Sequence, residues 1–285
     1  SKHTFEEHII SKHYSTTNNC NLELPSEGAT MKFTNHKDKM ERPFIVYADW
    51  ECTLIKTHEE GKTHRHKANS CGFYFLRTFD NTRNKYYQFT GDNCTAEMIA
   101  ELKALAVECI AEMRENATMY LSVEEEKQHR EAETCSLCNG DFEGDKAFKK
   151  VRDHDHRTGK YRGACHNSCN INYFQNRYLP IFVHNLRGYD SHIILRQAFE
   201  MVDKKERISA IPQSSEKMMT FSIGDLKFKD SNQFMPASLD NLAQSLVSKN
   251  KENNYEHFHT MKKHFTDSEF EIICKKGVYP IRMGG

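Results

Sequence analysis

The chain has 285 residues, of which 38% are hydrophobic and 28% are charged, and its formal net charge is zero. A chain of this size can bury a sizeable core, so we expect two or three folded units. Its ten cysteines do not form the dense framework of a small disulfide-rich protein. It also has neither an apolar run of about 18 residues nor a leader of basic and then apolar residues. These features exclude a membrane-spanning or secreted protein, and we expect an intracellular one, nuclear or cytoplasmic.

The first 40 residues give few signals of regular structure. Phe5, His8, His13 and Cys20 resemble the second half of a zinc finger whose cysteine pair is absent. We expect this segment to be a weakly ordered arm.

A buried strand is predicted at residues 43–51, where apolar and aromatic residues lead to Asp49 and Glu51. Side chains two positions apart on a strand point to the same face. Two carboxylates on one face can hold a metal ion. The alternative is that they are ordinary solvated residues at a strand end.

The elements that follow are strands at residues 72–79 and 85–89 and then a helix. Asp80 and Asn81 provide the turn between the strands. Thr95 is a candidate cap for the helix, whose apolar residues recur every three or four positions.

Two pairs of metal-ligating residues with the same spacing flank residues 139–165. Cys135 and Cys138 form one pair, and His166 and Cys169 form the other. Four such ligands can complete the tetrahedral shell of a structural Zn²⁺ ion. Cys165 is a rival to His166, but the spacing of His166 and Cys169 mirrors that of the first pair. The alternative to a zinc site is a set of buried free thiols.

The segment between these pairs carries residues suited to phosphodiester cleavage. His154 can serve as a general base, because an imidazole near its free pKa is about half deprotonated around neutral pH. Asp153 and Asn170 offer the oxygen ligands that Mg²⁺ or Mn²⁺ accepts. The alternative is a zinc module that only braces its host.

Charge is unevenly distributed around this segment. Residues 122–145 are mostly acidic, whereas residues 146–177 are mostly basic. A basic block that coincides with a nuclease core favours contact with DNA phosphates over a merely solvated face. The candidate DNA-binding residues are Lys149, Lys150, Arg152, Arg157, Lys160 and Arg162.

Beyond the second ligand pair we expect a strand from Ile181 and a helix that opens near Asp190. Gly224 and Asp225 predict a tight hairpin between two further strands. Residues 238–246 predict an amphipathic helix that packs on the core.

The central segment resembles the endonuclease VII branch of the HNH (ββα-metal) nucleases. The resemblance lies in the pattern formed by Asp153, His154, His156, Arg162, Gly163, His166, Cys169 and Asn170. It implies that Asp153 and Asn170 bind the catalytic metal, that His154 is the base and that His156 belongs to the same site. Val151 departs from the pattern, because the family often has another histidine there.

The flanking segments resemble the exonuclease module of the protein-primed family B DNA polymerases of Maverick/Polinton-type mobile elements. Asp49 and Glu51 match its first motif, and the stretch from Asn185 to Asp190 matches its second. The third motif should place an aspartate four positions after Tyr279, where this chain has Met283. The resemblance implies an RNase H-like 3′–5′ exonuclease fold with an incomplete two-metal site at Asp49, Glu51 and Asp190. Nothing in the chain resembles a polymerase palm.

We therefore predict an α/β protein in which an RNase H-like exonuclease fold is interrupted by a small zinc-bound ββα-metal insertion. Its expected parts are an arm at 1–40, an exonuclease-like domain at 41–125 and 179–285, and the insertion at 126–178. The predicted function is a Mg²⁺- or Mn²⁺-dependent DNA endonuclease, with branched DNA as a candidate substrate by analogy with endonuclease VII. Two alternatives stay open: a silent nucleic-acid-binding fragment of a polymerase, and an active exonuclease with a purely structural zinc insert. The expected partners are DNA, a second copy of the chain or the remainder of a polymerase.

Overall fold

The computed structural model describes residues 4, 6–7, 26–31, 33, 35–39, 41–142, 149–173, 177–201, 206–214, 217–247 and 255–274. The chain divides into two units, Ser1–His36 and Lys37–Gly285. Phe5, His8, His13, Cys20 and Tyr279 lie outside the described residues, so the predicted arm and the third motif stay predictions. Among the described helices, none is long and apolar enough to cross a membrane.

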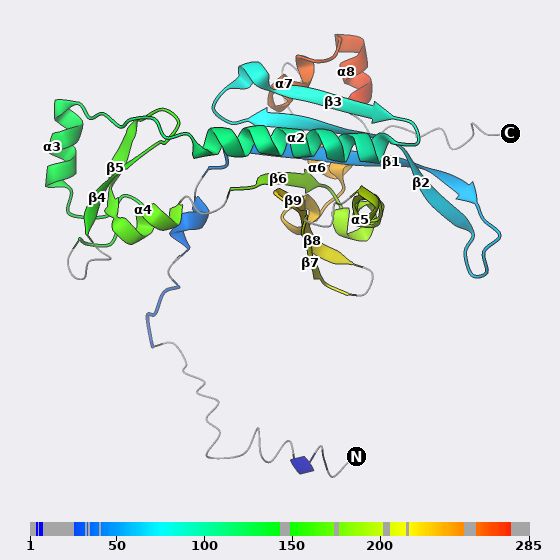
Figure 1. Ribbon diagram of the computed structural model, residues 1–285, viewed down its shortest axis with the longest axis horizontal. Coiled ribbons are helices and arrows are strands. Elements are labelled where there is room, and N and C mark those ends of the chain that lie inside the picture. The colour runs from blue at the N-terminus through cyan, green and yellow to red at the C-terminus, as the bar shows by residue number, and fades with distance from the viewer. Residues whose placement is uncertain are drawn as a thin grey trace. The chain divides into compact units, whose positions relative to one another are not determined.

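The second unit is a mixed α/β structure, which confirms the predicted α/β class (Figure 1). Its strands are β1 (Phe44–Lys56), β2 (His64–Arg77), β3 (Lys85–Thr90), β4 (Lys150–His154), β5 (Tyr161–His166), β6 (Leu179–Val183), β7 (Ile208–Pro212), β8 (Met218–Ile223) and β9 (Leu226–Asp230). Its helices are α2 (Cys94–Arg114), α3 (Val123–Glu131), α4 (Asn167–Tyr173), α5 (Asp190–Met201), α6 (Leu239–Leu246), α7 (His259–Lys262) and α8 (Asp267–Ile273).

Seven strands form one sheet in the order β3-β2-β1-β6-β9-β8-β7. β1 pairs antiparallel with β2 and parallel with β6, and β6 pairs parallel with β9. The two flanks of the sheet are antiparallel hairpins. The carboxyl ends of β1, β6 and β9 therefore point the same way, which is where open α/β sheets place their ligands.

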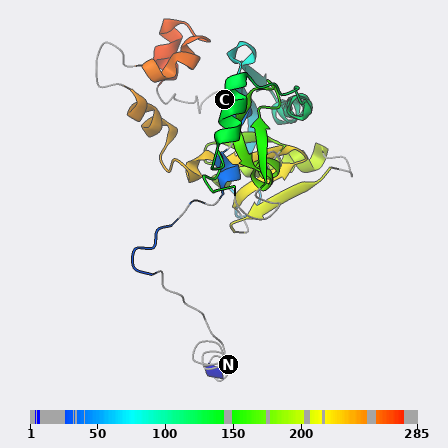
Figure 2. The same cartoon turned by 90° about the vertical axis from the view of Figure 1, so that its left-hand side faces the viewer.

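The hydrophobic core lies between one face of this sheet and helices α2 and α5 (Figure 1). In β1, Phe44, Val46 and Trp50 are buried while Tyr47 and Asp49 are exposed, as expected for a strand with period-two alternation. The buried residues of α2 recur at helical spacing and cover β2 and β3. α7 and α8 contact each other and form the orange-to-red group in Figure 2, and the His264 ring just after α7 contacts Tyr74 of β2.

Two predictions about helices were wrong. Thr95 does not cap α2; the helix begins one residue earlier, at Cys94, whose N–H donates to the Gly91 carbonyl, and Thr95 is buried. The amphipathic helix expected at 238–246 does form as α6, and Ser238 caps it by accepting a hydrogen bond from the Asn241 N–H. However, no α6 side chain is buried, so this helix is not the packing element we expected.

A second, two-stranded sheet of β4 and β5 forms between α2 and β6 in the chain. α4 packs against both of its strands, and α3 packs against β5. The loop between β4 and β5 lies on the linker that follows α2. There the Ala117 N–H donates to the His156 carbonyl at 2.6 Å, and Tyr120 forms an isolated bridge with Lys160.

Gly159 makes this close approach of loop and linker feasible. Its φ is +72°, and a Cβ atom there would lie 2.5 Å from the Thr118 carbonyl oxygen.

Gly159→Ala should therefore lower the thermal stability of the protein, because it adds a backbone clash to the cost of about 1–2 kcal/mol for a left-handed alanine. Melting temperature measured by circular dichroism would test this.

Gly61→Ala is the matched control, because Gly61 has a φ of +77° but a Cβ atom there would meet no other atom within 4 Å. It should show only the conformational cost. Equal destabilisation by the two substitutions would contradict the proposed packing of the loop on the linker.

Candidate metal centre and catalytic hairpin

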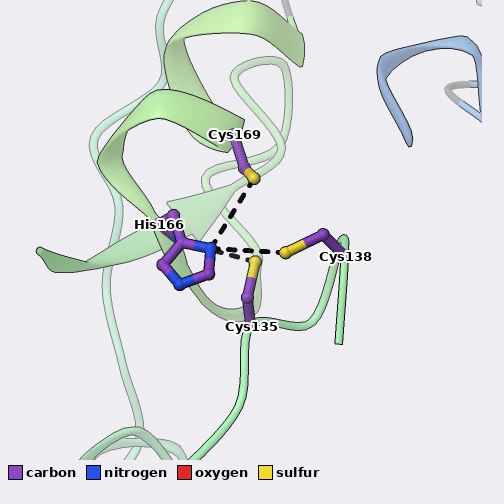
Figure 3. Close-up of side chains that lie close together, drawn as sticks. All are labelled: Cys135, Cys138, His166 and Cys169. Atoms are coloured by element: carbon purple, nitrogen blue, oxygen red, sulfur yellow. Dashed lines mark hydrogen bonds between the residues drawn. The ribbon is translucent and has the colours of Figure 1, made fainter. Parts of the chain in front are cut away.

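The four predicted zinc ligands lie together (Figure 3). The ligand atoms of Cys135, Cys138, His166 and Cys169 are all within 4.8 Å of one another. His166 Nδ1 is 3.3 Å from the Cys138 sulfur and 3.8 Å from the Cys169 sulfur. Zinc bonds of about 2.3 Å to sulfur and 2.0 Å to nitrogen imply a tetrahedral S···N separation of about 3.5 Å. The donor set and its spacing therefore fit a zinc ion with three sulfur ligands and one nitrogen ligand.

The surroundings of His166 favour the same metal-binding geometry. Its Nε2 lies 2.8 Å from the Asp141 carbonyl oxygen. A carbonyl can only accept, so Nε2 carries the proton and Nδ1 keeps its lone pair toward the sulfurs. Such an outer hydrogen bond is the usual way in which proteins fix the orientation of a metal-binding histidine.

The Cys135–Gly140 turn holds the first ligand pair. The Cys135 N–H donates to the Gly140 carbonyl, and the Asn139 N–H donates to the Cys135 carbonyl, both at 2.8 Å. Burial raises the pKa of the Cys135 thiol, but the backbone N–H groups of His166, Cys138 and Leu137 outweigh that effect, so its pKa is lowered. Stabilising the thiolate prepares this sulfur for a cation.

The rival ligand Cys165 is not in the group. It precedes His166 on β5, so the two side chains point to opposite faces of the strand. Cys165 is fully buried, and burial, together with the negative charge of Asp153, raises the pKa of its thiol to about 12. The structure thus brings His166 rather than Cys165 to the centre.

The candidate catalytic residues lie at the end of the same hairpin. Asp153 is buried, and both its oxygens accept hydrogen bonds from the Arg162 guanidinium, at 2.8 and 2.9 Å. His154 follows an irregularity in the β4–β5 register, and its ring stacks on His156 with centroids 4.7 Å apart. A bulge of this kind redirects a side chain, which is why bulges are common beside active sites.

His154 also contacts a residue that the sequence did not single out. Its Nε2 lies 3.2 Å from Asn116 Oδ1, in the linker after α2. Burial and the neighbouring His154 lower the pKa of His156, which favours its neutral form. Asn170 is half-buried on α4, the helix that packs against β4 and β5.

Most of the candidate DNA-binding residues have partners within the chain. Arg152 forms two hydrogen bonds with Glu126 of α3, and Lys150 donates to the carbonyls of Arg130 and Ala132 at the end of that helix. Arg157 pairs with Asp155, and Arg162 pairs with Asp153. Lys149 and Lys160 are exposed. Arg152 and Lys150 therefore hold α3 against the hairpin, whereas Arg157 and Arg162 neutralise carboxylates of the hairpin itself.

The carboxylates of the second predicted site lie near the carboxyl ends of the parallel strands. Asp49 and Glu51 are exposed on β1, whereas Asp190 is buried at the start of α5. Burial, and after it the negative charges of Asp49, Glu51 and Asp230, raise the pKa of Asp190 to about 7. Asp230 is buried on β9 and accepts hydrogen bonds from the backbone N–H groups of Arg187 and Asn232.

Residues 112–202 match the family of recombination endonuclease VII. This segment contains the metal centre, the β4–β5 hairpin and Asn116. No curated protein matches the chain.

We expect the purified protein to bind about one zinc ion, because a closed four-ligand site contributes directly to folding. Cys135→Ser should release the metal and unfold the β4–β5 region, as measured by elemental analysis and by hydrogen exchange.

Cys165→Ser is the matched control on the same hairpin and should retain zinc. Loss of zinc from the Cys165 variant with retention in His166→Ala would show that the ligand assignment is wrong.

Proposed function

We propose that this protein is a Mg²⁺- or Mn²⁺-dependent DNA endonuclease whose active site is the β4–β5 hairpin with α4. The observation that carries the proposal is the endonuclease VII match over residues 112–202, which covers both the metal centre and the Asp153–His154 pair. Asp153 and Asn170 are the proposed ligands of the catalytic ion, and His154 is the proposed base. Branched DNA is a candidate substrate by analogy alone.

The hydrogen bond of His154 supports its role as a base. An Nε2–H that donates to Asn116 Oδ1 leaves the Nδ1 lone pair free to accept a proton from an attacking water. His156, stacked on the same ring and favoured in its neutral form, adds no positive charge that would oppose protonation of His154.

The Asp153–Arg162 pair is compatible with a metal site. A carboxylate has about four lone-pair positions, and the two Arg162 hydrogen bonds occupy two of them. The remaining positions can bind a divalent ion, which when bound would stabilise charge on the phosphate and on the leaving oxygen. Arg162 then orients the ligand, and Lys149 and Lys160 are the exposed cations available to DNA phosphates.

The seven-stranded sheet supports an RNase H-like exonuclease scaffold as the host of this insertion. An antiparallel β3-β2-β1 flank joined to parallel β6 and β9 is consistent with such a scaffold, and Asp49, Glu51 and Asp190 lie near the carboxyl ends of the parallel strands. Asp230 is held by backbone donors, which argues against its taking the place of the aspartate that the third motif should have at Met283. We therefore propose a degenerate exonuclease site. On this proposal the chain acts with the remainder of a polymerase, or as a homodimer.

An active exonuclease with a purely structural zinc insert is the second candidate. The charges of Asp49 and Glu51 acting on the buried Asp190 favour it, because a divalent ion would relieve that repulsion.

His154→Ala should reduce Mg²⁺-dependent nicking of supercoiled DNA by roughly 10²–10⁴-fold, the usual contribution of a general base. Zinc content and DNA affinity should change little, because the base acts on the chemical step. Nicking assays on agarose gels and binding titrations would measure both effects.

The Asp49→Ala, Glu51→Ala double variant is the matched control and should nick DNA normally. Undiminished nicking by the His154 variant would contradict the endonuclease proposal. If, instead, labelled 3′ ends are shortened and the double variant abolishes this trimming, the exonuclease candidate is the correct one.

A further inference from the structure

A hollow of about 860 Å³ lies where the loop of the β4–β5 hairpin meets the large sheet. Its lining comes from β1, β2 and β3, from the second half of α2, and from Arg157 and Thr158 of the loop. Sites for small molecules usually measure roughly 300–1,000 Å³. The hollow is therefore large enough for a ligand of nucleotide size. Among its described lining residues are neither His154 nor any proposed metal ligand, so it is distinct from both candidate nuclease sites.

Two guanidinium groups line the hollow with N–H donors that the protein does not use. Arg77 is only 7% exposed, and its Nη2 donates to Glu112 at 2.8 Å. Arg157 Nη2 lies 3.3 Å from Asp155. Arg77 Nε and Arg157 Nη1 are also buried, but neither donates to any atom in the part of the chain that the structure describes. The Asp80 oxygen that pairs with Arg77 Nε is 3.9 Å away, too far for a hydrogen bond. A buried donor without an acceptor costs free energy, so a ligand oxygen here would be stabilising.

The ring of Phe79 keeps the two guanidiniums near each other. The Arg157 guanidinium lies 3.6 Å from the ring centroid, and the Arg77 guanidinium lies 4.8 Å from it. Contact with an aromatic ring orients a guanidinium but leaves N–H groups in its own plane available to a ligand. Both arginines are therefore within reach of one phosphate group.

The walls of the hollow carry opposite charges. The sheet side and the hairpin loop supply cations, namely Arg77, Arg83, Lys85 and Arg157. The α2 side supplies carboxylates, namely Glu108, Glu112 and Glu115. These carboxylates recur at positions i, i+4 and i+7, which share one face of a helix. Glu112 is bonded to Arg77, whereas Glu108 and Glu115 are exposed. A ligand that fits both walls is an anion at one end and a hydrogen-bond donor at the other.

We propose that this hollow binds a mononucleotide of adenine or cytosine. Its phosphate accepts hydrogen bonds from Arg77 and Arg157, and the amino group of its base donates to Glu108 or Glu115. Arginine suits the first role because guanidinium groups bind phosphate through several N–H groups at once. Adenine and cytosine carry an amino donor where thymine has a carbonyl acceptor, so a carboxylate selects against thymine. The proposal does not depend on the chemistry of His154.

The first test is calorimetric titration with deoxyadenosine monophosphate (dAMP), thymidine monophosphate (dTMP), deoxyadenosine and inorganic phosphate. No divalent ion is added, so that a nucleotide held through a metal ion at Asp49 and Asp190 does not contribute. We expect dAMP to bind roughly 10- to 100-fold more tightly than each of the other three. This is the usual effect of losing a hydrogen bond to a charged group.

Variants of the two walls separate the two ends of the ligand. Arg157→Gln should weaken dAMP binding by roughly 10- to 100-fold and leave the weak binding of deoxyadenosine unchanged. A Glu108→Gln, Glu115→Gln double variant should lose the preference for dAMP over dTMP. Arg152→Gln is the matched control, because Arg152 is an arginine of the same hairpin that does not line the hollow.

The second test uses the unaltered protein, so that it does not depend on how a variant folds. Photo-crosslinking with 8-azido-dAMP, followed by mass spectrometry, should place adducts on the lining of the hollow, at Phe79 or within residues 105–115. Adducts confined to the surroundings of Asp49 and Asp190 would overturn the proposal.

Three calorimetric outcomes would also overturn it. The first is no binding of dAMP at millimolar concentration. The second is deoxyadenosine or inorganic phosphate that binds as tightly as dAMP, because the hollow would then recognise only one end of the ligand. The third is an Arg157→Gln variant that binds dAMP as tightly as the Arg152→Gln control.

Discussion

The four-ligand group of Cys135, Cys138, His166 and Cys169 is the constraint on which the candidate active site depends. It joins the turn at Cys135–Cys138, the end of β5 at His166 and the first turn of α4 at Cys169. A two-stranded sheet with one short helix buries too little apolar surface to be stable alone. A structural zinc ion supplies on the order of 10 kcal/mol in small metal-stapled domains. Asp153 and His154 owe their positions to that hairpin.

A second set of contacts connects the hairpin with the large sheet. The Arg157 guanidinium lies 3.6 Å from the centroid of the Phe79 ring, and Arg77 lies 4.8 Å from the same ring. Together with Asn116 and the Gly159 loop, these contacts mean that the linker after α2 helps to shape the candidate nuclease site. The match to recombination endonuclease VII begins at residue 112, within α2, and so includes this linker.

Local patterns predicted the parts of the structure that depend on spacing. The period-two alternation of β1, the tight β8–β9 hairpin and the four-ligand group all follow from residues close together in the chain or at matched intervals. Long-range pairing was not predictable in the same way. Glu126 belongs to an acidic run and Arg152 to a basic one, and nothing in either run shows that the two residues meet. The hydrogen bond between Asn116 and His154 could not be predicted, because an asparagine in a linker gives no sign in the sequence of which residue it contacts.

Zinc-edge X-ray absorption of the purified protein tests the account most directly, because it reports the ligand shell itself. The account predicts three sulfur ligands at about 2.3 Å and one nitrogen ligand at about 2.0 Å. A shell of four sulfurs would place Cys165 rather than His166 on the metal. The hairpin would then be held in a different register from the one that presents Asp153 and His154, and the account would be contradicted.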